Sequence, residues 1–434
     1  MKTNGFSLTR AQIWNYLILF AFICTASILA CLNTSGQYNA SMAVLTLAVN
    51  LHSCFKVKHN WYLLIIYGFI FYSNYSICMA NYIAHIDDYF TAWQYTQTAV
   101  NGLYILLVFS LLLNLIAPQH KPERPIPPLL VNNRYHLAIT VGILFLLICI
   151  GIFSFSRPDI AGERGSGSAL YEYAIVGFII GLYYTGKVRW LQFLYVGLGI
   201  FFVLQNFMFG GRIESLQIIL LFVFAFLTDK LKLSYVLPFL FIGLIILTGI
   251  GHFRAQFELN TANLLQVINI LKNNYLVTDT AYAAYFASLT FLAVLPFTPW
   301  AMRLHFFYKF LVYIFLGSGV SGFNLWGYTN GFFRHYGGGL LPFFAYFYLG
   351  IIGVLVTAYY LWFLFKKINS ISENSSGFWR CAGLYLTVSV FRWYLYSPSQ
   401  ITRGFLLFSI CYLIAHYAYK CLNFKPILHT KVKA

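Results

Sequence analysis

The sequence predicts an all-α integral membrane protein that crosses the bilayer about 12 times. Of its 434 residues, 60% are hydrophobic and only 9% are charged. A soluble domain carries roughly 25% charged residues, so this chain lacks the polar groups that a water-exposed surface needs. Apolar runs long enough to cross about 30 Å of hydrocarbon recur along the chain. Alternating polar and apolar strands are absent, which argues against an outer-membrane barrel.

The predicted spans begin close to the N-terminus, with an apolar run that has no small-residue cleavage pattern and is typical of a signal-anchor. We expect residues 1–434 to form a single integral-membrane domain. The eight cysteines fall mostly inside spans and form no CxxC pair, so they indicate neither a zinc site nor a redox site. The predicted spans are 12–32, 38–55, 61–80, 97–117, 135–154, 170–186, 189–209, 213–228, 234–251, 340–364, 379–396 and 403–420.

The connections between spans alternate in charge. One set carries most of the lysines, including the pairs Lys56/Lys58 and Lys366/Lys367, and the positive-inside rule places this set in the cytoplasm. Both termini are then cytoplasmic, and the Pro-rich stretch 118–134 is a cytoplasmic linker. The net charge of +17 follows largely from this rule, so it does not indicate a nucleic-acid partner.

The longest outward connection spans residues 252–339, a total of 88 residues. It contains two apolar, aromatic segments, 281–295 and 304–320, separated by prolines. They are predicted to be re-entrant or interfacial helices. The alternative is a further hairpin of two true spans, which would raise the count to 14.

Arginine and lysine are distributed unequally between the two predicted sides. The cytoplasmic side has 13 Lys and 5 Arg, whereas the outward side has 2 Lys and 8 Arg. An arginine offers a rigid, permanently charged fork that matches the oxygens of phosphate or carboxylate. The outward arginines therefore suit a lipid-linked phosphate or pyrophosphate, although pairing with nearby acids would explain some of them.

Seven arginines are candidates for binding such an anion. Arg212 follows two glycines at the start of a span, where helix-start amides favour anions. Arg392 lies about one turn inside a span, and an ionisable group at that depth is a functional candidate. The seven candidates are Arg212, Arg254, Arg334, Arg392, Arg403, Arg157 and Arg164.

The candidate catalytic bases are His335, beside Arg334 and a glycine run, and Glu214, at the start of a span. Glu172 is a weaker candidate. Aromatic side chains in the long loop, Tyr328, Trp326 and Tyr336 among them, are candidates for stacking on sugar rings. Motifs for serine nucleophiles, metal ligands and nucleotide-binding loops are absent, so no metal site and no cofactor is expected.

The chain resembles the O-antigen polymerases, the Wzy-type polymerases of oligosaccharide repeat units. The resemblance rests on a dozen spans with both ends inside and one long external loop before the last spans. It also rests on Gly-Gly-Arg212 opening a span and on Thr329-Asn330 followed by Gly350-Ile351-Ile352-Gly353. The Arg-x10-Gly repeats of some members are not found here.

The resemblance implies a metal-independent glycosyltransferase with the multispan, GT-C-like architecture, in the bacterial inner membrane. Such enzymes join undecaprenyl-pyrophosphate-linked repeat units into O-antigen at the periplasmic face. The partners implied are these lipid-linked glycans, the bilayer, a chain-length regulator and a flippase. The arginines would hold pyrophosphate, and His335 matches the position of a histidine that the related ligases use.

Two alternatives stay open. A flippase of the lipid-linked repeat unit also has about 12 spans and a basic cavity, but the long outer loop argues against it. An O-antigen ligase shares the chemistry of the polymerase. It usually shows a tighter His-Asn pattern after the loop, which Thr329-Asn330 breaks.

Overall fold

The computed structural model describes residues 10–84, 96–118, 129–130, 135–156, 166–209, 212–232, 265, 269, 279–335, 337–372 and 374–423. Within these ranges the regular secondary structure is helical, apart from one antiparallel pair of two-residue strands, β1 (Phe155–Ser156) and β2 (Ser166–Gly167). Seven of the described helices are long and apolar enough to cross a membrane, which confirms an all-α membrane protein. The total of 12 spans stays a prediction, and span 234–251 lies outside the described residues.

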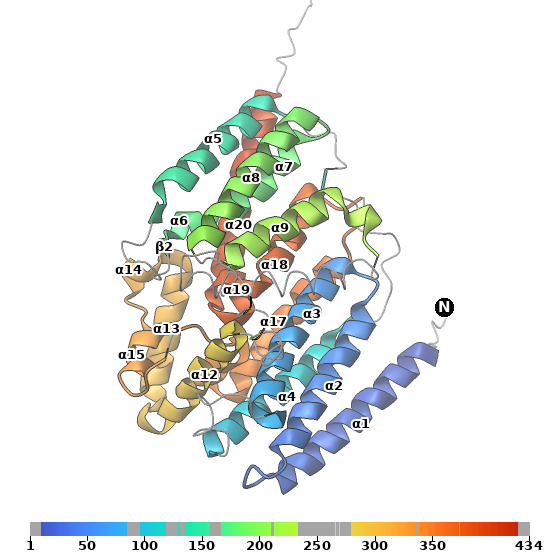
Figure 1. Cartoon of the computed structure of the whole chain (residues 1–434), viewed down its shortest axis with the longest axis vertical. Coiled ribbons are helices and arrows are strands. Elements are labelled where there is room, and N and C mark those ends of the chain that lie inside the picture. Colours follow the sequence, from blue (N-terminus) through green and yellow to red (C-terminus); the bar gives the residue numbers. More distant parts are fainter. Residues whose placement is uncertain are drawn as a thin grey trace, which may run out of the picture.

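The first four helices form one side of the molecule (Figure 1). Each agrees with a predicted span to within a few residues, and α1 lies at the edge with large apolar side chains such as Trp14 and Phe20 exposed. In a bilayer these side chains would face lipid. The helices are α1 (Arg10–Leu32), α2 (Asn39–Val57), α3 (Trp61–Cys78) and α4 (Gln97–Ile116), and α3 continues into a π-helical turn, η1 (Met79–Ile83).

A second group of helices lies on the opposite side in Figure 1, and the C-terminal helices lie between the two groups. Helix α18 contacts α3 on one side and both α7 and α9 on the other. The second group is α5 (Leu137–Phe153), α6 (Ala169–Glu172), α7 (Ala174–Thr185), α8 (Arg189–Phe209), α9 (Ile213–Phe226) and the short η2 (Thr228–Lys230). The C-terminal helices are α18 (Gly377–Val388), α19 (Val390–Leu395) and α20 (Ser399–Leu422).

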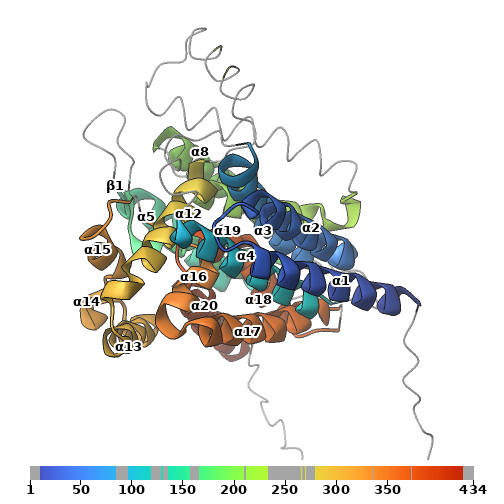
Figure 2. The same cartoon turned by 90° about the horizontal axis from the view of Figure 1, so that it is seen from below.

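The predicted external loop contains helices of its own. The first that the structure describes in full, α12 (Asp279–Val294), packs against α3, α4 and α16, and Tyr285 and Leu289 are fully buried. This burial shows that the helix packs within the protein, and whether residues 281–295 are re-entrant, interfacial or spanning stays a prediction. The next helices lie side by side at one edge in Figures 1 and 2. They are η3 (Leu295–Phe297), α13 (Trp300–Leu316), α14 (Ser318–Ser321) and α15 (Leu325–Asn330).

Three predicted spans are interrupted, which corrects the prediction of single continuous helices. The span 340–364 is two helices, α16 (Leu341–Leu349) and α17 (Ile351–Asn369), because Gly350 has a φ of +63° and reverses the chain. The two helices then fold against each other. The span 170–186 breaks at Tyr173 and the span 379–396 breaks at Ser389. Hydropathy reports where a chain is apolar and not where a helix changes direction.

Antiparallel packing brings connections of like charge to the same end of the molecule. The Asn60 side-chain amide donates to Asn369 Oδ1 at 3.3 Å, which joins the start of α3 to the end of α17. The His136 amide donates to the Tyr184 carbonyl at 3.3 Å, which joins the start of α5 to the end of α7. These are lysine-bearing ends by sequence. The starts of α9 and α20 and the end of α19 therefore lie at the other end.

Candidate functional site

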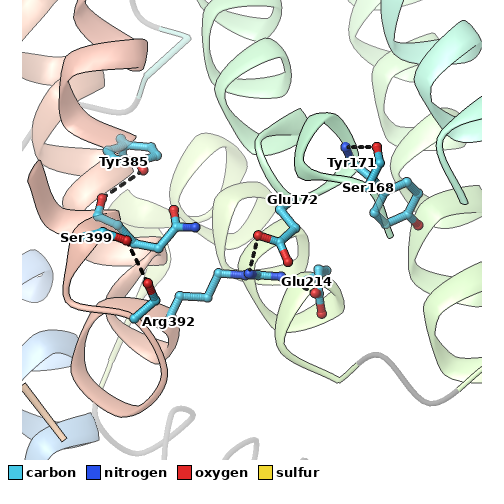
Figure 3. Close-up of polar contacts among 9 residues, drawn as sticks. Ser168, Tyr171, Glu172, Glu214, Tyr385, Arg392 and Ser399 are labelled. Carbon is cyan, nitrogen blue, oxygen red and sulfur yellow. Dashed lines mark hydrogen bonds and ion pairs between the residues drawn. The ribbon is translucent and has the colours of Figure 1, made fainter. Parts of the chain in front are cut away.

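Arg392 lies between two carboxylates that come from distant parts of the chain. Its Nη1 is 2.9 Å from Glu172 Oε2, and its Nη2 forms an ion pair with Glu214 Oε1 (Figure 3). The side chains of Arg392 and Glu214 are 12% and 11% exposed, whereas that of Glu172 is 34% exposed. Removing one partner of such a buried ion pair typically costs about 3–5 kcal/mol, because the other charge is left uncompensated.

All three residues sit at the ends of short helices. Glu172 is the last residue of α6, Glu214 lies in the first turn of α9, and Arg392 belongs to the six-residue helix α19. The break before α19 is stabilised by the Trp393 indole, whose Nε1 donates to the Leu386 carbonyl at 3.0 Å and satisfies the end of α18. Discontinuous helices in membrane proteins commonly build substrate sites, because their ends present backbone dipoles and polar side chains.

A second arginine lies close to this ion pair. The guanidinium of Arg403, in the first turns of α20, lies 5.1 Å from the centre of the Tyr313 ring. The phenol of Tyr173 interacts electrostatically with Arg403, Tyr313, Glu172 and Arg392. We call these five residues together with Glu214 the arginine cluster. It joins α6, α9, α13, α19 and α20 at the end of the molecule opposite the lysine-bearing connections.

The other predicted anion-binding arginines are placed differently. Arg212 precedes the first residue of α9 and is half-buried two positions from Glu214, so it lies at the same end of the molecule. Arg334 is exposed on the loop before α16. Arg157, Arg164 and Arg254 lie outside the described residues.

Arg303, which the sequence also counts among the outward arginines, has a structural partner. Its Nε donates to the Phe347 carbonyl and its Nη2 to the Tyr346 carbonyl, at 2.6 and 2.9 Å. Its guanidinium also lies 3.8 Å from the centre of the Trp300 ring. Arg303 thus satisfies carbonyls at the end of α16, where a helix leaves its last four carbonyls without partners.

His335, the first candidate base, is 6% exposed and hydrogen-bonded through both ring nitrogens. Its Nδ1 accepts from the Gly337 amide at 3.1 Å, and its Nε2 is 2.8 Å from the Thr329 hydroxyl. Its own amide donates to Asn330 Oδ1 at 2.8 Å. Burial lowers the pKa of His335, since a buried imidazolium loses hydration. These contacts favour a structural role in the loop, and the catalytic role stays a prediction.

The predicted sugar-binding aromatics use their polar tips within the protein. The Trp326 indole donates to the Gly338 carbonyl at 2.8 Å, and the Tyr328 hydroxyl is 3.0 Å from the Thr298 hydroxyl. Tyr336 lies outside the described residues. The two described side chains are half-buried, so they stabilise the loop in this structure, and sugar binding stays a prediction.

The glycine run before α16 positions α19. Gly337, Gly338 and Gly339 have φ values of +85°, +81° and +141°, which glycine adopts readily because it has no Cβ. The Gly339 amide donates to the Leu395 carbonyl at 2.9 Å. A Cβ on Gly339 would lie 2.7 Å from the Phe344 ring. The run therefore holds the last turn of α19, one turn after Arg392.

An apolar pocket of about 130 Å³ lies between α13, α16, α17 and α20. Its wall includes Thr402, the neighbour of Arg403, and Phe310, one turn before Tyr313. Tyr348 also lines it, is 3% exposed, and has a hydroxyl that makes no hydrogen bond within the described residues. The pocket is thus mostly apolar, and its lining reaches the first turn of α20, the helix that carries Arg403.

Sequence reasoning identified four members of the arginine cluster but gave Glu172 little weight and did not single out Tyr173. The signal available for both was an acidic and a phenolic group side by side near the outward end of a predicted span. Among the described residues, no group of three or more His, Cys, Asp or Glu side chains is arranged to hold a metal ion. No family model, curated protein or solved structure matches the chain.

Proposed function

We propose that this protein is a membrane glycosyltransferase that polymerises undecaprenyl-pyrophosphate-linked oligosaccharide repeat units at the periplasmic face of the bacterial inner membrane. The main observation that supports this function is the arginine cluster. It lies at the end of the molecule that the charge pattern assigns to the outside of the membrane. Arg392 and Arg403 belong to this cluster with the two carboxylates of Glu172 and Glu214, and Arg212 lies at the same end of the molecule, at the start of α9. Such a site suits a pyrophosphate that must be held and then released as a leaving group.

Arg392 and Arg403 have different contacts, which indicate different roles. Arg392 is already neutralised by two carboxylates, so its role is to orient them. Arg403 contacts an aromatic ring and has no ion pair within the described residues, so it is the better candidate for contacting a phosphate. The apolar pocket lined by Thr402, the residue before Arg403, would accept part of the hydrocarbon chain of the same lipid.

The test is a lipopolysaccharide gel of a strain from which the gene is deleted. Loss of the ladder, with core plus a single repeat unit retained, is expected, because flipping and ligation would remain intact. Core without any repeat unit would instead indicate the flippase or the ligase. A full ladder in the deletion strain would reject all three functions.

Complementation with Arg403→Ala tests the assignment of the phosphate contact. We expect polymerisation to fall by about 10²–10³-fold, the usual effect of losing one group that stabilises a developing anion. Arg403→Lys keeps the charge but not the fork, and should retain part of the ladder. The measurement is ladder intensity at matched protein level. Arg189→Ala, at the opposite end of the molecule, is the control and should leave the ladder unchanged.

A further inference from the structure

We propose that Glu172 is the general base that deprotonates the acceptor sugar hydroxyl, and that Glu214 and Arg392 position it. This inference rests on the proposed function and assigns to Glu172 a role for which Glu214 and His335 are the candidates from sequence. The three candidate bases, Glu172, Glu214 and His335, differ in their solvent exposure and in their contacts, and this difference supports the proposal.

Glu172 is the most accessible of them. Its side chain is 34% exposed, and only Oε2 contacts Arg392. No hydrogen bond to its other oxygen, Oε1, is found in the described part of the chain. One oxygen is therefore held while the other is available to a substrate hydroxyl. A general base needs both properties, because proton transfer requires a fixed geometry and direct reach.

The other two candidates have less access. The Glu214 side chain is 11% exposed and pairs with Arg392 from the first turn of α9. His335 is buried with both ring nitrogens in hydrogen bonds, so it would have to break a contact before accepting a proton. Glu214 and Arg392 instead form a buried support that fixes the orientation of the Glu172 carboxylate.

The surroundings of Glu172 also supply the opposite charge that a transfer reaction needs. Tyr173, the next residue, interacts electrostatically with Arg403 as well as with Glu172 and Arg392. A carboxylate that accepts a proton and an arginine that contacts a departing pyrophosphate thus both lie near one phenol. The site therefore brings a candidate base for the acceptor and a candidate cation for the donor close to the same residue.

The proposed glycosyl transfer needs only the acceptor, the donor and the side chains named above. The acceptor hydroxyl oxygen attacks the anomeric carbon of the donor glycan and forms the new glycosidic bond. The bond between that carbon and the phosphate oxygen breaks, and its electron pair leaves with undecaprenyl pyrophosphate. The hydroxyl proton moves to Glu172 Oε1. Arg403 stabilises the negative charge on the leaving group.

The experiment uses the full-length protein in detergent, with lipid-linked repeat unit extracted from the deletion strain. Glu172→Gln should lower kcat by about 10²–10⁴-fold with little change in KM, because the amide keeps the size of the side chain but cannot accept the proton. Asp229→Asn, at the opposite end of α9 from Glu214, is the matched control and should keep the wild-type rate.

Sodium azide separates a base from a structural residue. Azide is a nucleophile that needs no deprotonation, so it should restore donor consumption by Glu172→Gln and yield a glycosyl azide. Glu214→Gln should lower the midpoint of thermal unfolding, and azide should not restore its activity. If azide rescues Glu214→Gln and not Glu172→Gln, the two roles are reversed and the proposal is wrong.

Failure of this inference is distinguishable from failure of the proposed function. If wild-type protein polymerises the extracted lipid-linked unit and Glu172→Gln does so at the same rate, Glu172 is not the base but the function stands. If wild-type protein has no activity and the deletion strain keeps its ladder, the proposed function itself is rejected. A reduced kcat without azide rescue, together with a lower unfolding midpoint, would make Glu172 a structural residue.

Discussion

Arginines that share one side of the predicted membrane topology have different chemical roles in this structure. Arg303 donates to backbone carbonyls at the end of α16, Arg392 bridges Glu172 and Glu214, and Arg403 lies against Tyr313. An arginine that is bonded to carbonyls or carboxylates has less of its charge available for a ligand. The value of each arginine for function therefore depends on its partners, which only the folded chain supplies.

At the same scale, His335 should make stability depend on pH. Burial lowers its pKa below the usual value of 6.5, so the unfolded chain takes up a proton in a range where the folded chain does not. The free energy of unfolding therefore falls as the pH drops from the usual histidine pKa of 6.5 towards the lower pKa of His335 in the folded protein. We expect the unfolding midpoint of the protein to drop between about pH 8 and pH 5, and to drop less in His335→Gln.

The measurement is thermal unfolding in detergent over that pH range. His305→Gln, which removes an exposed histidine of α13, is the control and should keep the wild-type dependence. An identical pH dependence in His335→Gln would show that other groups cause it.

Among the elements, the interrupted helices have the most consequence for the site. The breaks at Tyr173 and Ser389 place Glu172 and Arg392 at helix ends, where their side chains meet. The reversal at Gly350 folds α16 against α17 and leaves carbonyls that Arg303 satisfies. In continuous helices these side chains would point away from a helix face at mid-span, and they would not meet at helix ends.

The Gly350 reversal should be sensitive to a single methyl group. Its φ of +63° and ψ of −147° lie in a region that other residues rarely adopt, so Gly350→Ala should destabilise the protein by about 1–3 kcal/mol. Gly197→Ala in α8 is the matched control, since a Cβ there meets nothing within 4 Å. Both are measured by thermal unfolding, and equal midpoints for the two variants would contradict the prediction.

For the whole molecule, the packing gives two ends of different character. One end carries lysine-bearing connections, and the other carries the arginine cluster together with the starts of α9 and α20. The positive-inside rule assigns the first end to the cytoplasm. This orientation decides whether the site meets periplasmic substrates.

Cysteine labelling tests the orientation. In a background with the eight natural cysteines replaced by serine, Ser35→Cys and Ser370→Cys place one exposed thiol at each end. A membrane-impermeant thiol reagent should label Ser35→Cys in intact spheroplasts and Ser370→Cys only after permeabilisation. The reverse pattern would place the arginine cluster in the cytoplasm and reject a periplasmic site.

The sequence by itself determined the class of the protein, the position of most helices and the end at which the arginines gather. Apolar runs and lysine-rich connections are local properties of the chain, so they can be recognised without a structure. The tertiary structure decided which arginine has which partner. Glu172, Glu214 and Arg392 are far apart in sequence, and the breaks at Tyr173 and Ser389 come from packing that hydropathy does not record. Contacts between distant residues depend on how helices end and turn, and for that reason the site emerged only from the fold.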